Sequence, residues 1–154
     1  MPGLINARLE QLGIILPEVA APAGNYAPAV QSGPMLYISG QLPLLDGRPD
    51  AIGLVGKQID LETAFAAARL CGLNIVAQAK AILGDLDRVV RVVKLTGYVA
   101  STPDFVDHPK VMNGASDLMA EVFGDKGVHA RAAVGVASLP LGVPVEVEAI
   151  LEIA

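Results

Sequence analysis

A single arginine lies in a predicted β-strand whose other side chains on the same face are small. Arg131 alternates with Ala133, Gly135 and Ala137, and alternate residues of a strand point to the same side. A guanidinium group is permanently charged and presents a planar fork of donors, which suits two-point binding of a carboxylate. The small neighbours leave space above the strand for a ligand or for a second subunit. The pattern therefore indicates a carboxylate-binding site at Arg131.

An ion pair within the fold would give Arg131 a purely structural role instead. The last predicted strand carries three glutamates on one face, which are Glu146, Glu148 and Glu152. Structural ion pairs are common in proteins and binding sites are few, so the residue pattern by itself gives this alternative more weight.

The signatures of other catalytic chemistries are missing from the sequence. It carries no glycine-rich motif of a dinucleotide or P-loop phosphate site. Its only histidines are His108 and His129 and its only cysteine is Cys71, so neither a metal nor a cofactor is expected. Cys71 lies in a predicted helix among alanine and leucine residues, where a small buried side chain is more typical than a reactive thiolate. No G-x-S-x-G turn marks a serine hydrolase.

The first elements that frame this site are a short helix and a hairpin. Apolar residues recur at helical spacing over residues 5–12, and Gly13 follows them as a helix stop. Residues 29–31 and 35–39 are rich in strand formers and flank a Ser-Gly-Pro turn, which predicts a hairpin. Gly40 is expected to end its second strand.

Two longer helices and a central strand follow. Residues 61–83 keep a 3.6-residue period, although Gly72 and Asn74 interrupt it and allow a bend. Residues 88–99 are dense in valine and apolar on both faces, as a central strand would be. Residues 109–123 begin with proline and carry a buried apolar stripe, which predicts the second helix.

The last two strands, residues 130–137 and 145–153, are predicted to form a second hairpin. Residues 145–153 alternate between apolar and mostly acidic side chains, the pattern of a sheet with one dry face. The order of elements predicts a two-layer α+β domain, with two helices on one face of a mixed or antiparallel sheet. The other face is expected to meet a second copy of the sheet.

Composition limits the partners and the compartment. The 154 residues suit one domain, and 53% hydrophobic and 18% charged residues, with a mean hydropathy of +0.51, favour a homo-oligomer. A net charge of −5 argues against nucleic acid as a partner. The long uncharged stretch over residues 19–45 contains four prolines, so no membrane span is expected there. Without a convincing signal peptide and with one cysteine, a cytoplasmic location is expected.

Two separated motifs resemble the signatures of a known family. Residues 129–140, HARAAVGVASLP, with residues 144–149, PVEVEA, resemble the C-terminal signature of the RidA/YjgF family of reactive intermediate deaminases. Residues 24–26, GNY, and residues 36–43, LYISGQLP, resemble its N-terminal signature. The resemblance covers the chain from residue 25 onward, and we treat residues 1–154 as one domain with residues 1–24 as an N-terminal extension.

The resemblance implies a chorismate-mutase-like fold that assembles as a homotrimer whose sheets face an internal barrel. Sites in this family lie in clefts between subunits, where an arginine matching Arg131 holds the substrate carboxylate. The residues matching Tyr26 and Gly40 help to form the pocket.

Further site residues are implied in the same way. Glu146 falls where the family places a glutamate that positions or activates water, and Asn113 matches a pocket asparagine. Many members carry Ser-Cys after the arginine, whereas this chain has Ala132-Ala133. A polar role for that thiol is therefore absent, although backbone groups near Ala133 are expected to stabilise developing charge.

The resemblance implies hydrolysis of reactive enamines or imines of amino acids to 2-oxo acids and ammonia, without a cofactor. Arg131 would bind the carboxylate of this small substrate, and Glu146 would order or deprotonate the attacking water. Two alternatives are a trimer that binds small carboxylates without turning them over, and an endoribonuclease. The acidic charge and the 4% content of aromatic residues argue against the endoribonuclease.

Overall fold

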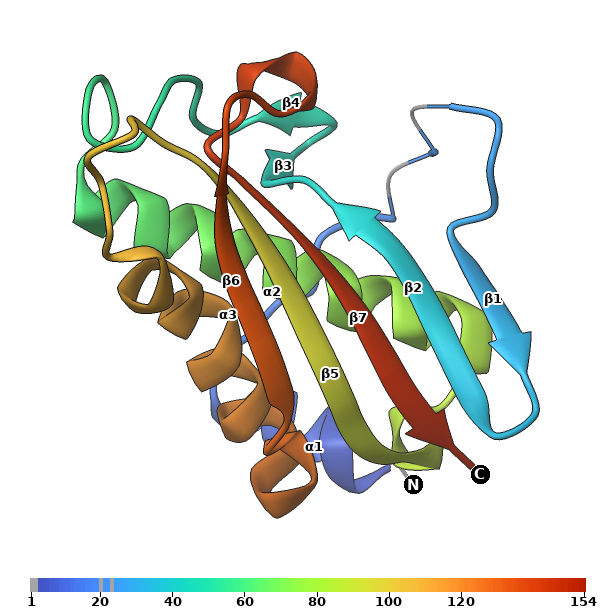
Figure 1. Cartoon of the computed structure of the whole chain (residues 1–154). Helices are drawn as coiled ribbons and strands as arrows, with labels where there is room; N and C mark the ends of the chain where they lie inside the picture. The colour runs from blue at the N-terminus through green and yellow to red at the C-terminus, as the bar shows by residue number, and fades with distance from the viewer. Residues whose placement is uncertain (1–2, 20, 23) are drawn as a thin grey trace.

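A five-stranded sheet forms the front of the molecule in Figure 1, and two long helices pack behind it. The computed structural model describes residues 3–19, 21–22 and 24–154. The strand order is β1-β2-β7-β5-β6. The strands of the sheet are β1 (Ala29–Ser32), β2 (Met35–Gln41), β5 (Val89–Ala100), β6 (Ala130–Val136) and β7 (Val145–Ile153). The helices are α1 (Leu4–Gln11), α2 (Leu61–Leu83) and α3 (His108–Phe123).

The pairing of the last two strands differs from the predicted hairpin. β7 lies between β2 and β5 and is antiparallel to both, whereas β6 pairs with β5 in parallel at the edge of the sheet. The hairpin prediction is wrong because α3 carries the chain from the end of β5 back to the start of β6, which makes the two strands parallel. The alternation predicted for residues 145–153 is confirmed, since every second residue of β7 is buried.

The hairpin of β1 and β2 forms as predicted, but Gly40 does not end it. β2 continues to Gln41, and its register against β7 shifts between Ile38 and Gln41. Gly40 therefore lies in an irregular stretch of the strand, a common place for glycine.

A small second hairpin, β3 (Leu44–Leu45) and β4 (Arg48–Pro49), follows β2 and was not predicted. Asp46 and Gly47 connect its strands with φ angles of 52° and 76°. Two positive φ angles in a two-residue loop are typical of Asp-Gly hairpin turns, so this dipeptide could have predicted the hairpin from the sequence.

α2 is the central helix of the core, and it runs through Asn74 as one element rather than bending there. The Asn74 side chain donates hydrogen bonds to the carbonyls of Leu42 and Leu44, 3.1 and 3.2 Å away. The polar residue in this buried helix thus anchors the segment that follows β2. Among the described helices α2 is long and apolar enough to cross a membrane, but most of it is buried inside the fold, as expected of a core helix.

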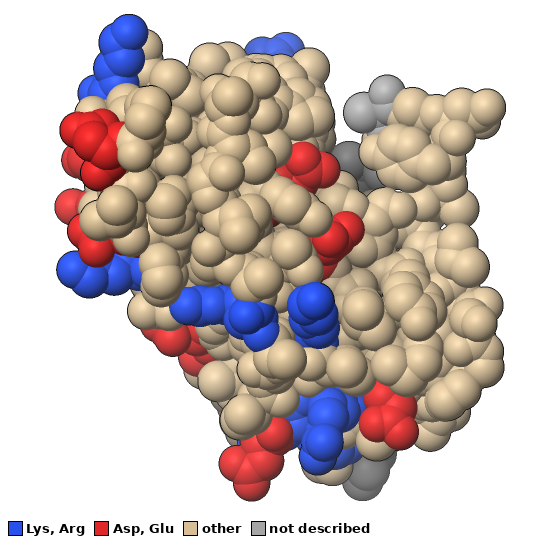
Figure 2. All heavy atoms as spheres, viewed as in Figure 1, with Lys and Arg blue, Asp and Glu red and all other residues tan. Residues whose placement is uncertain are grey.

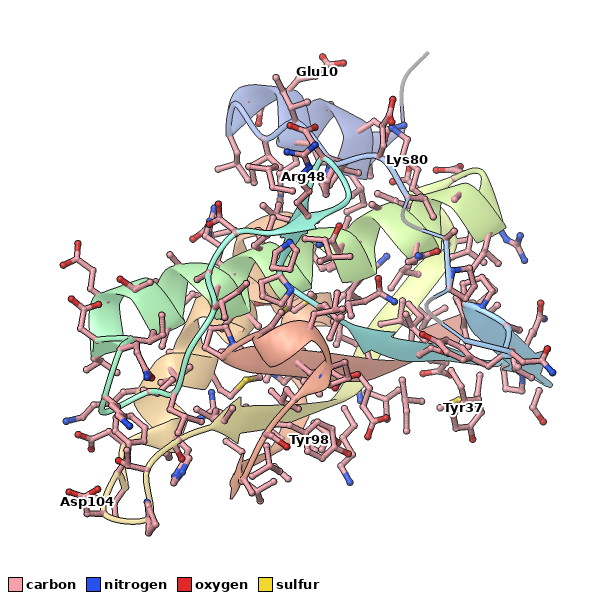
Figure 3. The ribbon with its side chains drawn as sticks, turned by 90° about the horizontal axis from the view of Figure 1, so that it is seen from above. Glu10, Tyr37, Arg48, Lys80, Tyr98 and Asp104 are labelled. Carbon is pink, nitrogen blue, oxygen red and sulfur yellow. The ribbon has the colours of Figure 1, made fainter. Side chains whose placement is uncertain are left out.

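No element of the described part of the chain covers the face of the sheet opposite the helices. Figure 2 views this face and shows it to be largely uncharged, with a few acidic and basic side chains near its middle and along its edges. Tyr37 and Tyr98 project from this side, away from α2 (Figure 3). Tyr37, Val30 and Val134 are each more than two-fifths exposed. We name this surface, which includes Val30, Tyr37, Tyr98 and Val134, the open face.

The N-terminal helix is fastened by a distant carboxylate. No side chain within its own first turn caps α1; instead Asp87 accepts hydrogen bonds from the backbone N–H groups of Leu4 and Ile5 at 2.8 and 2.9 Å. The bonds from Ile5 and Leu4 lower the pKa of Asp87 below its ordinary value. α1 lies in the stretch we treat as an extension, and residues 1, 2, 20 and 23 of that stretch lie outside the described residues.

Asp87→Asn is expected to loosen α1 without unfolding the sheet, because a neutral amide is a weaker partner for a helix N-terminus. Amide hydrogen exchange at Leu4 and Ile5 should accelerate several-fold, while exchange in β7 stays unchanged. Since the folded-state pKa of Asp87 is lowered, its contribution is complete above pH 3.8, its unperturbed pKa, and is lost as the pH falls through the lower value. Asp117→Asn, on an exposed part of α3, is the control for charge. Faster exchange throughout the sheet would contradict this role.

Candidate functional site

Arg131 lies on the helix-facing side of the edge strand β6. Its register partner on β5 is Leu95, which is fully buried beneath the helices. The guanidinium reaches α3, where Nη1 donates to Asn113 Oδ1 at 2.8 Å and to Ser116 Oγ at 3.2 Å. Nη2 donates to the carbonyl of Pro109 at 3.3 Å. Asn113 and Arg131, two of the predicted site residues, are therefore in direct contact, and Ala133 follows on the same face of β6.

No carboxylate neutralises Arg131 among the described residues. Its three acceptors are an amide, a hydroxyl and a peptide carbonyl. The ion-pair alternative is wrong because Leu95 also pairs with the buried Ala149 of β7, which turns Glu146, Glu148 and Glu152 toward the open face. A guanidinium has five N–H donors, so two donors, Nε–H and one on Nη2, remain after these three hydrogen bonds. A carboxylate can accept both.

A series of hydrogen bonds connects Arg131 to the residues just before β6. Ser116 Oγ lies 2.8 Å from Nε2 of His129, and Nδ1 of His129 lies 2.6 Å from the carbonyl of Gly127. Because a carbonyl only accepts, Nδ1 carries the proton and the Nε2 of a neutral imidazole accepts from the Ser116 hydroxyl. The hydroxyl oxygen is then oriented to accept from Arg131. His129 and Ser116 thus hold one end of the guanidinium.

Ser116→Ala removes one acceptor of Arg131 and disconnects His129. Because Asn113 and Pro109 still hold the guanidinium, we expect the affinity for a small 2-oxo acid to fall only about fivefold, the effect of one hydrogen bond. Titration calorimetry measures this change. Ser116→Thr keeps the hydroxyl and should retain most of the affinity. Equal affinities of Ser116→Ala and the parent protein would show that the hydroxyl does not position Arg131.

A second group of predicted site residues lies around the irregular stretch of β2. The Glu146 carboxylate packs directly on Gly40, so that a Cβ at position 40 would collide with Oε1. Burial and then the charge of Glu148 raise the pKa of Glu146 above its ordinary value. Tyr26, which is 51% exposed, lines a hollow of about 40 Å³ together with Gly40. A hollow of this size holds little more than a water molecule.

The two groups of residues lie apart in one chain. Arg131 is on the edge strand and faces the helices, whereas Glu146 is two strands away and faces the open side. Neighbouring strands are about 4.8 Å apart, so the strands of Arg131 and Glu146 alone are separated by roughly 10 Å. If β6 and β7 had formed a symmetric hairpin, Arg131 would have lain opposite Glu152. The two strands do not pair, so this arrangement does not occur.

Comparison with known proteins identifies the family. The sequence model described as "YjgF/chorismate mutase-like, putative endoribonuclease" matches residues 6–152. The chain belongs to the YjgF family. A curated relative, Protein TCP17 of Trypanosoma cruzi, is 51% identical over 152 residues, covering 98% of this chain and 95% of that protein.

Two solved structures share the YjgF fold closely. The protein Atu1372 from Agrobacterium tumefaciens, described as of unknown function, is 54% identical with a TM-score of 0.90 and covers 97% of this chain and 92% of its own. A protein from Shewanella oneidensis is 36% identical with a TM-score of 0.95, covering 98% of this chain and all of its own. The α+β fold with a mixed sheet, predicted from the order of elements, is confirmed, and so is the chorismate-mutase-like fold that the resemblance implied.

Sequence reasoning missed Ser116 and His129 as partners of Arg131. The strand period was a usable signal, because His129 stands two residues before Arg131 and so points to the same side. On the predicted helix, Asn113 and Ser116 have the i, i+3 spacing that places two side chains on one face. What the sequence could not show was that this face of the helix meets that face of the strand.

Proposed function

We propose that this YjgF-family protein hydrolyses reactive imines and enamines derived from amino acids, giving 2-oxo acids and ammonia. The observation that carries the proposal is the arrangement of Arg131, which is held by neutral acceptors and keeps two donors free. A charged group fixed in place without a counter-charge is suited to bind an anionic ligand. The small side chain of Ala133 leaves room beside it for the rest of a small carboxylate.

The reaction needs little beyond positioning and one proton transfer. With the carboxylate on Arg131, water adds to the carbon of the protonated C=N bond while Glu146 accepts a proton from it. Glu146 returns this proton to the nitrogen of the resulting carbinolamine. The C–N bond then breaks and the hydroxyl group gives its proton to the departing ammonia, which leaves the C=O bond of the 2-oxo acid and an ammonium ion. Backbone groups near Gly40 and Ala133 stabilise the developing charges. An enamine enters the same route after protonation to the imine.

A complete site is formed between copies of the chain in this proposal. Arg131 and Asn113 of one subunit meet Glu146, Gly40 and Tyr26 of another, because in one chain Arg131 faces the helices whereas Glu146 lies two strands away and faces the open side. The largely uncharged open face supports a homotrimer in which the sheets face one another. We place this assembly in the cytoplasm.

Relatives of this fold support a small ligand. RidA of an Antarctic Psychrobacter is 29% identical with a TM-score of 0.62, covering 88% of this chain and 94% of its own. TdcF of E. coli, at 24% identity and a TM-score of 0.65, covers 89% of this chain and 94% of its own and was solved with bound serine, a small molecule that carries a carboxylate.

Glu146→Gln should lower turnover roughly tenfold while leaving the affinity for a 2-oxo acid within about twofold, because glutamine orders water but accepts no proton. The raised pKa of Glu146 places the acidic limb of the pH–rate profile above the ordinary value of 4.5. Turnover is lost as the pH falls through that pKa. Glu148→Gln removes a neighbouring charge and should move the limb to lower pH. A Glu146→Gln protein as active as its parent would remove the glutamate from the mechanism.

The activity is tested with 2-imino acids generated in place by an amino-acid oxidase and trapped by semicarbazide. Catalytic amounts of the protein should reduce the trapped product, because hydrolysis removes the imine first. No reduction across a broad panel of amino acids, by a protein that still binds 2-oxo acids, would leave a carboxylate-binding trimer as its function. Cleavage of RNA that survives repurification and Arg131→Ala would favour the endoribonuclease.

A further inference from the structure

A larger hollow opens on the same side of β6 as Arg131, at the other end of the strand. It has a volume of about 440 Å³ and lies where β5 ends and α3 begins. Ser101 contributes a hydroxyl group and His108 an imidazole to its lining, and both side chains are half-buried. The remaining lining residues are Thr102, Pro103, Phe105, Gly135, Val136 and Ala137.

Ser101 and His108 form a fixed polar pair in this hollow. Ser101 Oγ lies 3.2 Å from Nε2 of His108. Phe105 meets the imidazole edge to face, with ring centroids 5.3 Å apart and planes at 86°, which restrains the ring. A Cβ on Gly135 would lie 2.6 Å from Nε2 and 3.1 Å from Oγ. The glycine therefore makes room for the pair directly above the strand.

The hollow lies next to the carboxylate site at Arg131. Arg131, Ala133 and Gly135 form one row on the same face of β6. The Nη2 atom of Arg131 donates to the carbonyl of Pro109, the residue that follows His108 in the chain. The guanidinium thus reaches the first turn of α3 next to His108, which carries the imidazole. On the strand, only the methyl group of Ala133 lies between the two positions.

We propose that Ser101 and His108 form a subsite for the end of the substrate side chain, and this inference rests on the proposed function. Ser101 can accept a hydrogen bond from Nε2–H of His108 and donate its own proton to a ligand oxygen. The preferred substrates are then 2-imino acids whose side chains end in a carboxamide or carboxylate oxygen.

The length of the row selects the length of the substrate. Four residues of strand place the Cα atoms of Arg131 and Gly135 about 13 Å apart. The guanidinium donates to Pro109 and the Ser101 hydroxyl lies beside His108, so the two ends of the site are closer together than these Cα atoms. A ligand of about five carbons, with roughly 7 Å between its terminal oxygens, suits such a separation. One added hydrogen bond corresponds to about a tenfold gain in affinity over an apolar side chain of equal length.

The test is titration calorimetry of the full-length protein with three five-carbon 2-oxo acids, the products of the proposed reaction. 2-Oxoglutaramate and 2-oxoglutarate carry the terminal oxygen as an amide or a carboxylate, and 2-oxopentanoate ends in a methyl group. We expect one or both polar ligands to bind about tenfold more tightly than 2-oxopentanoate. Ser101→Ala should remove this preference while leaving the affinity for 2-oxopentanoate within twofold. His108→Phe, which keeps a ring against Phe105, should do the same.

The outcomes separate this inference from the proposed function. Equal affinities for all three ligands in the parent protein, or a preference that survives Ser101→Ala, would overturn the subsite while leaving Arg131 as a carboxylate site. A preference lost in Ser101→Ala, in a protein without imine hydrolysis, would support the subsite and overturn the deaminase. Failure to bind any of the three ligands would overturn both.

Discussion

Arg131→Ala should weaken the binding of a small 2-oxo acid by about 100-fold and lower imine hydrolysis by at least as much. The change removes the two free donors and the only charge that the site offers to a carboxylate. Charge-assisted hydrogen bonds contribute about 1.5–3 kcal/mol, and 2.7 kcal/mol corresponds to a factor of about 100. Arg131→Lys keeps the charge but loses the fork, so its affinity should lie between those of the alanine variant and the parent protein.

Arg69→Ala is the matched control for this prediction. Arg69 lies on α2 and forms a two-point ion pair with Glu121 of α3, at 3.0 and 3.3 Å. Its charge is already satisfied, so the same substitution should leave ligand binding unchanged. Comparable losses in both variants would mean that Arg131 acts through the total charge of the protein and not as a binding group. A folded Arg131→Ala protein with undiminished affinity would place the carboxylate elsewhere.

Gly114→Ala should lower the free energy of unfolding by about 3 kcal/mol. A Cβ at this position of α3 would collide with the carbonyl oxygen of Phe65 in α2, and it would lie 3.0 Å from the Phe65 carbonyl carbon and 3.1 Å from the Arg69 nitrogen. Backbone atoms cannot rotate away, so the two helices must separate. Overpacking of a well-packed core typically costs about 1–3 kcal/mol, and a collision with fixed backbone atoms lies at the upper end of this range.

Thermal unfolding measures this effect, with Gly72→Ala as the control. Gly72 lies in α2, and a Cβ there would meet the Leu118 Cδ2 atom at 2.9 Å. A side-chain methyl group can move, and alanine is a better helix former than glycine by about 1 kcal/mol. We expect a melting temperature lower by about 6–12 °C for Gly114→Ala and nearly unchanged for Gly72→Ala. Similar shifts in both variants would show that the close approach at Gly114 does not control helix packing.

The sequence was most informative where the governing forces are local. The 3.6-residue period over residues 61–83 placed α2 correctly, because helical spacing acts within a few residues. The alternation of β7 was equally clear. The pairing of β6 with β5 was not clear, because any two strands that follow each other in the sequence are compatible with a hairpin. Only the packing of α3 against the sheet decides that β6 returns parallel to β5.

The candidate site was also only partly predictable, because it depends on which strands and helices pack together. The small residues around Arg131 indicated a carboxylate site, but they could not distinguish a free guanidinium from an ion pair. That distinction depends on the face toward which Glu146 points, and hence on the strand that lies between β6 and β7. His129 and Ser116 were not predicted as partners of Arg131, because their spacing indicates the face on which each lies but not that the two faces meet.

The position of β7 has a consequence for biosynthesis. β7 is the last strand of the sheet to leave the ribosome, yet it joins β2 to β5 at the centre. Until it emerges, the nascent chain holds two separate pairs, β1 with β2 and β5 with β6, each with an unpaired edge. The sheet therefore closes after translation of its final strand, and a chain truncated before residue 145 would expose both edges to aggregation and to proteolysis.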